Sequence, residues 1–164
     1  MLTSAEIHPT TDRYRQAAEA GNVDGIMETL SNDVVVYSPI TERLTFNGTA
    51  EVRELLENVF SLVDDVRYYA DVGDEATRAM FDRANVGGVP LDQTTRVRLN
   101  ERGEIFEITL FFRPLPGLAA LTAAIAPAVA RSRHGALRGA LAALLLRPLA
   151  LMTAFGDRLV GWFA

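Results

Sequence analysis

The chain has 164 residues, 49% of them hydrophobic, and no cysteine. This length and composition indicate one main folded domain, and the lack of cysteine excludes disulfides, thiolate metal sites and thiol nucleophiles. The charge is uneven, because residues 1–112 carry 20 acidic residues and 10 arginines whereas residues 113–164 carry one acidic residue and six arginines. An acidic main part is unlike a nucleic-acid-binding surface, and two histidines are too few for a histidine-rich metal site. We therefore expect no nucleic-acid partner, no metal and no cofactor.

Two short helices are predicted near the N-terminus, over residues 12–20 and from residue 25 to about residue 30. Asp12 is placed to accept hydrogen bonds from the first free amides of the first helix. Gly21 stands where a left-handed residue commonly ends a helix, and Asn22 then restarts the chain. This stretch is typical of a helical hairpin that packs against a larger element.

Strands and one clear helix follow. Residues 34–38 are β-branched or aromatic and precede Pro39, which is typical of a strand. A helix capped by Thr49 is predicted from apolar residues spaced i, i+3, i+4 and i+7, namely Val52, Leu55, Leu56, Val59 and Val63. Turn residues separate four further strands, at 66–72, 76–86, 93–100 and 104–113. The order predicts an α+β fold in which a curved antiparallel sheet packs on the N-terminal helices.

Residues 114–164 differ from the preceding chain, since they hold 14 alanines and 11 leucines and show no strand pattern. Pro127, Pro148 and the polar cluster at 131–135 divide this segment into about three helices. We therefore predict an α+β domain over residues 1–113 and an Ala/Leu-rich helical extension over residues 114–164.

Several roles are possible for the helical extension over residues 114–164. We favour a covering role, as a lid over the domain or as the surface of a homodimer. A helix lying in a membrane surface is the second reading, with Trp162 and Phe163 at its end. A membrane-spanning helix is disfavoured, because the longest uncharged run, residues 114–130, contains three prolines. A further alternative is that the extension fills the interior of the domain. The N-terminus lacks the pattern of a signal peptide, so we expect a cytoplasmic protein, with membrane association as the alternative.

The segments RYRQAAEAGNVDGIMETLSNDVVVYSP and NGTAEVRELL, followed by the strand pairs, resemble the nuclear transport factor 2-like superfamily. That superfamily includes ketosteroid isomerases, SnoaL-like polyketide cyclases and limonene epoxide hydrolases. The resemblance covers roughly residues 10–113. It implies a conical half-barrel with a deep apolar pocket between the concave face of the sheet and the helices. The implied ligand is a small, largely apolar molecule that is steroid-, terpenoid- or polyketide-like.

The resemblance carries over only part of the catalytic residues of the ketosteroid isomerases. Tyr14 matches the tyrosine that hydrogen-bonds the substrate oxyanion in those enzymes. The position of their general base falls on Ser38, and that of their protonated aspartate falls on Thr95. A serine hydroxyl is too weakly basic to take a carbon-bound proton at neutral pH. The resemblance therefore implies a pocket without the standard base.

The catalytic set of the epoxide hydrolases is also incomplete. Of its Asp-Arg-Asp triad only Arg78 is present, since Met80 and Leu110 stand where aspartates are needed. Asp82 is the one replacement base. The resemblance turns Arg78 and Asp82 toward the pocket, where burial would raise the pKa of the carboxyl. The alternation along this strand does not identify its apolar face, and we favour the alternative in which both residues lie in water at the open end.

Two functions are therefore predicted for the pocket, beside the membrane-surface reading. The first is binding of a small apolar molecule without chemistry. The second is an isomerase, cyclase or hydrolase that uses Tyr14 and Asp82. The residues predicted to contact the ligand are Tyr14, Ser38, Arg78, Met80, Thr95, Val97, Ile108, Leu110 and Phe112.

Overall fold

The computed structural model describes residues 8–137 and, beyond them, residues 140–141, 144–146, 148, 151–153 and 155–156. A six-stranded sheet has the strand order β2-β1-β6-β5-β4-β3. The strands are β1 (Leu30–Tyr37), β2 (Thr45–Asn47), β3 (Val63–Gly73), β4 (Thr77–Val86), β5 (Val89–Leu99) and β6 (Ile105–Arg113). The helices are α1 (Pro9–Glu19), α2 (Val23–Met27), α3 (Gly48–Phe60) and α4 (Leu115–His134).

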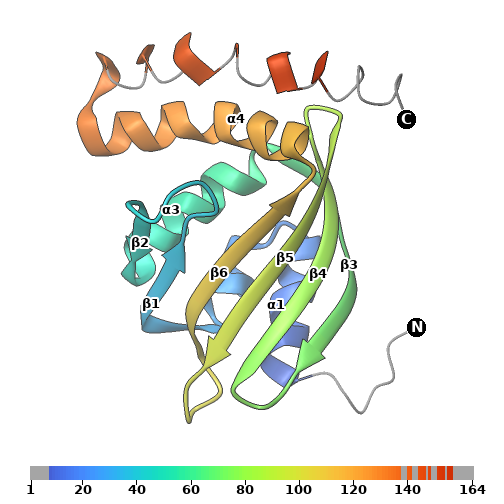
Figure 1. Cartoon of the computed structure of the whole chain (residues 1–164). Helices are drawn as coiled ribbons and strands as arrows, with labels where there is room; N and C mark the ends of the chain where they lie inside the picture. Colours follow the sequence, from blue (N-terminus) through green and yellow to red (C-terminus); the bar gives the residue numbers. More distant parts are fainter. Residues whose placement is uncertain are drawn as a thin grey trace.

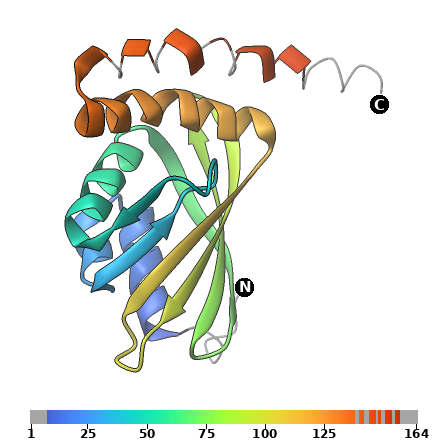
Figure 2. The same cartoon turned by 60° about the vertical axis from the view of Figure 1, so that its left-hand side comes forward.

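The long strands β3 to β6 curl around one side of the molecule, and the N-terminal helices pack on the concave face (Figure 1). α4 crosses one end of this curved sheet (Figures 1 and 2). The main core lies between sheet and helices and includes the fully buried Ile26, Val52, Met80, Val97 and Ile105. The predicted α+β fold, with a curved sheet on N-terminal helices, is confirmed.

The sheet departs from the prediction in two details. β1 runs parallel to β6, with Val36 opposite Ile108, whereas the other paired strands are antiparallel. This parallel pair is consistent with a long crossover, because α3 and four strands lie between β1 and β6 in the chain. The short β2 was not predicted, since three residues carry too little pattern to mark a strand.

The start of α1 differs from the prediction. Pro9 is the first residue of the helix, and the Nδ1 atom of His8 accepts a hydrogen bond from the N–H of Thr10 at 3.2 Å. Asp12 lies one turn inside the helix, where it accepts a hydrogen bond from the guanidinium of Arg15 at 2.8 Å. The prediction that Asp12 caps α1 is therefore wrong, because the proline is suited to the first helical position and moves the start upstream.

The predicted end of α1 at Gly21 is confirmed. Gly21 has φ +64°, and its N–H donates to the carbonyl of Ala18 at 3.0 Å. The N–H of Asn22 donates to the carbonyl of Ala17 at 2.8 Å, which completes a Schellman motif. The Asn22 side chain then accepts a hydrogen bond from Gly25 N–H at 3.0 Å and starts α2, as predicted. The predicted end near residue 30 is wrong, because α2 ends at Met27 and Leu30 already belongs to β1.

The substitution Gly21→Ala should lower the free energy of unfolding by about 1 kcal/mol, because a Cβ atom disfavours the left-handed conformation. A Cβ at this position would meet no atom within 4 Å, so the loss comes from the backbone alone. Urea denaturation measures it. Gly21→Asn is the control and should lose less, since asparagine tolerates positive φ. Equal losses for both variants would contradict this explanation.

Both ends of α3 differ from the prediction. Asn47 is the N-cap residue, and its N–H donates to the Glu51 carboxylate at 3.1 Å, so Thr49 lies inside the helix and does not cap it. Val63 was predicted as the last apolar residue of this helix, but it is the first residue of β3.

The first helix of the extension is longer than predicted. α4 continues through Pro127 for 20 residues, so the predicted break at this proline is wrong. The described residues between 136 and 156 are helical and lie along the side of α4 that faces away from the sheet (Figures 1 and 2). Most of the predicted third helix, including Trp162 and Phe163, is outside the described residues. Among the described residues, no helix is long and apolar enough to cross a membrane.

Candidate active-site cavity

A cavity of about 460 Å³ lies between the concave face of the sheet, α1, α3 and α4. Most of its lining is aliphatic or aromatic, and α4 contributes one wall through residues such as Leu121, Ile125 and Val129. The described part of the extension therefore covers the interior without filling it. The polar side chains in the lining are Tyr14, Ser38, Arg43, Tyr68, Asp82, Gln93 and Thr122. A mostly apolar cavity with a few polar groups is typical of a site for a small molecule.

β4 carries the acidic group of the cavity. The even-numbered residues of this strand are buried, and Asp82 and Arg78 are only 2% and 5% exposed. The favoured placement of both residues in water is therefore wrong. Asp82 lies in one cross-strand row with Tyr68 on β3 and Gln93 on β5, so the sheet register brings these three residues together.

The Asp82 carboxyl is poorly compensated. Its Oδ1 atom is buried and has no hydrogen-bond partner among the described residues. Burial, followed by the negative charges of Asp92 and Glu19, raises its pKa from 3.8 to about 7. The group is then close to half-protonated at neutral pH, which is the range required of a general base.

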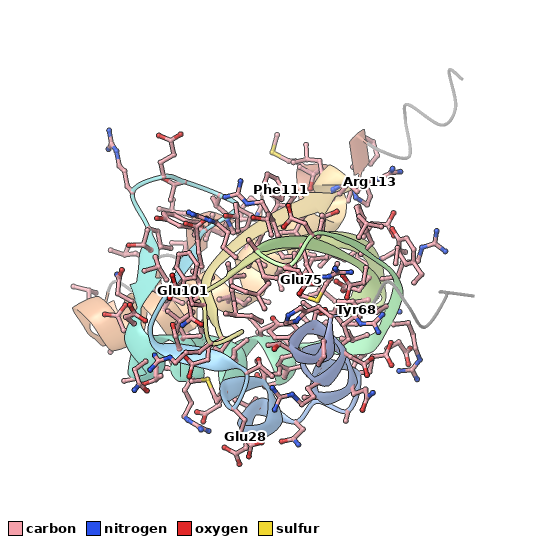
Figure 3. The ribbon with its side chains drawn as sticks, turned by 90° about the horizontal axis from the view of Figure 1, so that it is seen from below. Glu28, Tyr68, Glu75, Glu101, Phe111 and Arg113 are labelled. Atoms are coloured by element: carbon pink, nitrogen blue, oxygen red, sulfur yellow. The ribbon has the colours of Figure 1, made fainter. Side chains whose placement is uncertain are left out.

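Two tyrosines share the cavity with Asp82. Tyr14 projects from α1 and is 5% exposed, and its pKa is raised by burial and by the charge of Asp82. Burial also raises the pKa of Tyr68, with contributions from Tyr14 and Asp82. Both phenols therefore stay protonated and can donate a hydrogen bond. Tyr68 is labelled on β3 beside α1 in Figure 3, and its backbone N–H donates to the Glu19 carboxylate at 2.7 Å.

Arg78 belongs to a separate cluster. Its Nε donates to Asp71 Oδ1 at 2.7 Å, and the Thr11 hydroxyl donates to Asp71 Oδ2 at 2.6 Å. Arg15 lies 3.9 Å from the same carboxylate. Arg78 is not among the residues that line the cavity, so its guanidinium serves a buried ion pair that joins β3, β4 and α1.

The other predicted ligand contacts divide into two groups. Ser38, Ile108, Leu110 and Phe112 line the cavity together with Tyr14 and Asp82. Met80, Thr95 and Val97 are fully buried and do not belong to the described lining. The Thr95 hydroxyl instead accepts a hydrogen bond from the Gln93 amide at 2.6 Å and so holds a residue that does reach the cavity.

Sequence reasoning missed Tyr68 and Gln93. Both stand opposite Asp82 in the register, so a correct strand alignment would have identified them. Across the part of the chain that the structure describes, no group of three or more His, Asp or Glu side chains could hold a metal ion.

The comparison with protein families identifies one match. Residues 11–108 match the SnoaL-like domain, which is more than half of the chain. The chain belongs to the SnoaL-like domain family. This confirms the predicted place in the nuclear transport factor 2-like superfamily. A comparison with functionally curated proteins found no match.

Solved structures share the fold of this SnoaL-like domain. A Silicibacter pomeroyi protein described as having a cystatin-like fold is 26% identical, with a TM-score of 0.71 over 76% of this chain and 87% of that one. A steroid delta-isomerase from Pseudomonas aeruginosa is 22% identical, with a TM-score of 0.67 over 75% and 90%. An NTF2-like protein of unknown function from Cytophaga hutchinsonii is 14% identical, with a TM-score of 0.56 over 71% and 95%.

The SnoaL-like segment contains the polar side chains of the cavity apart from Thr122 on α4. Tyr14, Tyr68, Asp82 and Gln93 all lie within residues 11–108. α4 lies outside the matched segment, so one wall of the cavity comes from a part of the chain that the family does not define.

Proposed function

We propose that this SnoaL-like domain binds a small, largely apolar ketone and transfers a proton at the carbon next to the carbonyl group. The observation that carries this proposal is the Asp82 carboxyl, which faces an apolar cavity with one unpaired oxygen, a pKa of about 7 and two protonated tyrosines in the same lining. The proposed placement of the ligand puts its carbonyl oxygen near Tyr14 and its apolar part toward α4.

The chemistry follows from these groups. The ionised Asp82 removes a proton from the carbon, and the electron pair of that C–H bond moves into the enolate. A tyrosine hydroxyl donates a hydrogen bond to the oxygen on which negative charge develops. Return of the proton from Asp82 to a conjugated carbon gives an isomer, and return to the original carbon gives exchange with solvent. No cofactor is consumed.

The second candidate function is binding without chemistry. It is favoured by Ser38, which lines the cavity at the position where the ketosteroid isomerases carry their base. Both candidates require a ligand in the cavity, and they differ only in whether Asp82 takes a proton from it.

An exchange experiment separates them. The purified protein is incubated in D₂O with a β,γ-unsaturated ketosteroid, and deuterium in the steroid is followed by mass spectrometry. Incorporation above the buffer rate supports proton transfer. Saturable binding of the steroid without incorporation supports the second candidate, and absence of binding contradicts both for this class of ligand.

The substitution Tyr14→Phe should weaken binding of 2-naphthol, a phenol that resembles an enol, by roughly fivefold. The phenylalanine keeps the ring but removes one hydrogen bond, which is worth about 1 kcal/mol in a neutral pair. Fluorescence titration measures the dissociation constant. Tyr37→Phe is the matched control, since Tyr37 is 41% exposed and outside the cavity lining. Equal affinities for the two variants would remove Tyr14 from the binding site.

A further inference from the structure

An apolar stripe covers the outer side of the helical residues that follow α4. Seven large apolar side chains in this region are between 49% and 77% exposed, namely Leu137, Leu141, Leu144, Leu145, Leu151, Met152 and Phe155. At about 100° per residue, their spacing places all seven within roughly one third of the helix circumference. Exposed apolar side chains gathered on one helix face indicate an interaction surface.

The opposite face of this helical segment is less exposed. Leu146, Thr153 and Gly156 are less exposed than the members of the apolar stripe. The helical pieces lie along α4 in both views, so this smaller face is turned toward the body of the protein (Figures 1 and 2). The apolar stripe is therefore directed away from the sheet and the cavity.

The charged residues near the apolar stripe in the sequence are mostly arginines. Residues 131–164 carry five arginines, at 131, 133, 138, 147 and 158, and one acidic residue, Asp157. Arg138 and Arg147 stand in the sequence among the residues of the apolar stripe, and both lie outside the described residues. The acidic residues belong to the part of the chain before residue 108, apart from Asp157.

We propose that the apolar stripe lies in the surface of a membrane that contains anionic lipids. The leucines, Met152 and Phe155 would enter the boundary between headgroups and acyl chains, and the net positive charge of residues 131–164 would attract the lipid phosphates. Each arginine near such a surface adds electrostatic attraction that falls with salt. No described helix is suited to crossing the bilayer, so the mode of attachment is interfacial.

A second copy of the chain is the main competing partner. In a two-fold symmetric dimer the same patch meets itself, so two copies of this arginine-rich segment would approach each other. Asp157 is the one acidic residue of residues 108–164 against five arginines at 131–158, so the segment keeps a net positive charge. The charge pattern therefore favours an anionic lipid surface over self-association.

Co-sedimentation of the full chain with vesicles tests this proposal. We expect binding to phosphatidylcholine vesicles that contain phosphatidylglycerol, with clearly weaker binding to pure phosphatidylcholine and to either vesicle at high salt. The double variant Leu144→Gln, Leu151→Gln should lose at least about tenfold in partition, because two side chains no longer contribute apolar burial. The matched control is Tyr69→Gln, Val72→Gln on β3, where the two side chains are 50% and 52% exposed.

Every outcome of this experiment decides between the partners. Loss of partition in the first double variant alone, with unchanged urea denaturation, supports the proposal. Equal partition of both double variants, or no preference for anionic vesicles, overturns it. A concentration-dependent dimer in light scattering that the Leu144 and Leu151 substitutions abolish would show instead that a second copy covers the apolar stripe.

Discussion

The substitution Asp82→Asn is expected to slow proton transfer in the cavity by about 10²–10⁴-fold, the usual contribution of a positioned general base. The asparagine keeps the size of the side chain, but its amide cannot take a proton from carbon. Deuterium incorporation into the β,γ-unsaturated ketosteroid gives the rate at saturating steroid. Binding of the steroid should change far less than this rate, which separates a catalytic role from a binding role.

The dependence of that rate on pH provides an independent check. With a pKa of about 7 for Asp82, the rate should rise as the carboxyl ionises through this pH and then level off. Asp92→Asn is the control variant, because Asp92 raises the pKa of Asp82 through its charge. It should move the rise to lower pH and leave the plateau almost unchanged. An Asp82→Asn variant that retains most of the wild-type rate would refute Asp82 as the base.

The substitution Asp82→Asn should also increase the free energy of unfolding at high pH, by at most about 4 kcal/mol above pH 8. The pKa of Asp82 is about 7 in the folded protein and 3.8 as its ordinary value. Between these values the folded state binds more protons than the unfolded state, so the stability of the wild type falls as pH rises from about 4 to about 7. The neutral asparagine avoids this loss, although its buried amide offsets part of the gain.

Urea denaturation at several pH values measures this effect. The difference between Asp82→Asn and wild type should be smallest near pH 4 and largest above pH 8. Asp74→Asn should show the opposite sign, because hydrogen bonds from the backbone N–H groups of Thr77 and Ala76 lower the pKa of Asp74 and stabilise its ionised form. A difference in the free energy of unfolding that does not depend on pH would mean that burial does not raise the pKa of the Asp82 carboxyl.

Local signals predicted much of the fold. Gly21 and Asn22 marked the turn between the first two helices, and the apolar spacing after Asn47 marked α3. Predictions failed where a neighbour in space decided the outcome. Nothing local shows that β6 returns beside β1, and the composition around Pro127 favours a break that α4 does not make.

The site was harder to predict for a related reason. The buried face of β4 carries Arg78, Met80 and Asp82, so its polarity resembles that of an exposed face. Arg78 is tolerated there because Asp71, on the neighbouring strand, compensates its charge. Asp82 has no such partner among the described residues, and that lack is the feature that points to chemistry.

α4 completes the cavity from outside the SnoaL-like segment. The shape of the cavity and its polar groups Asp82 and Tyr14 therefore depend on different parts of the chain. Substitutions in Leu121, Ile125 or Val129 can reshape the space for a ligand while Asp82 and Tyr14 stay on β4 and α1. Selection for a new ligand can therefore act on this wall without disturbing Asp82 and Tyr14. A SnoaL-like domain with the same sheet could therefore take a different ligand when only the segment that follows β6 differs.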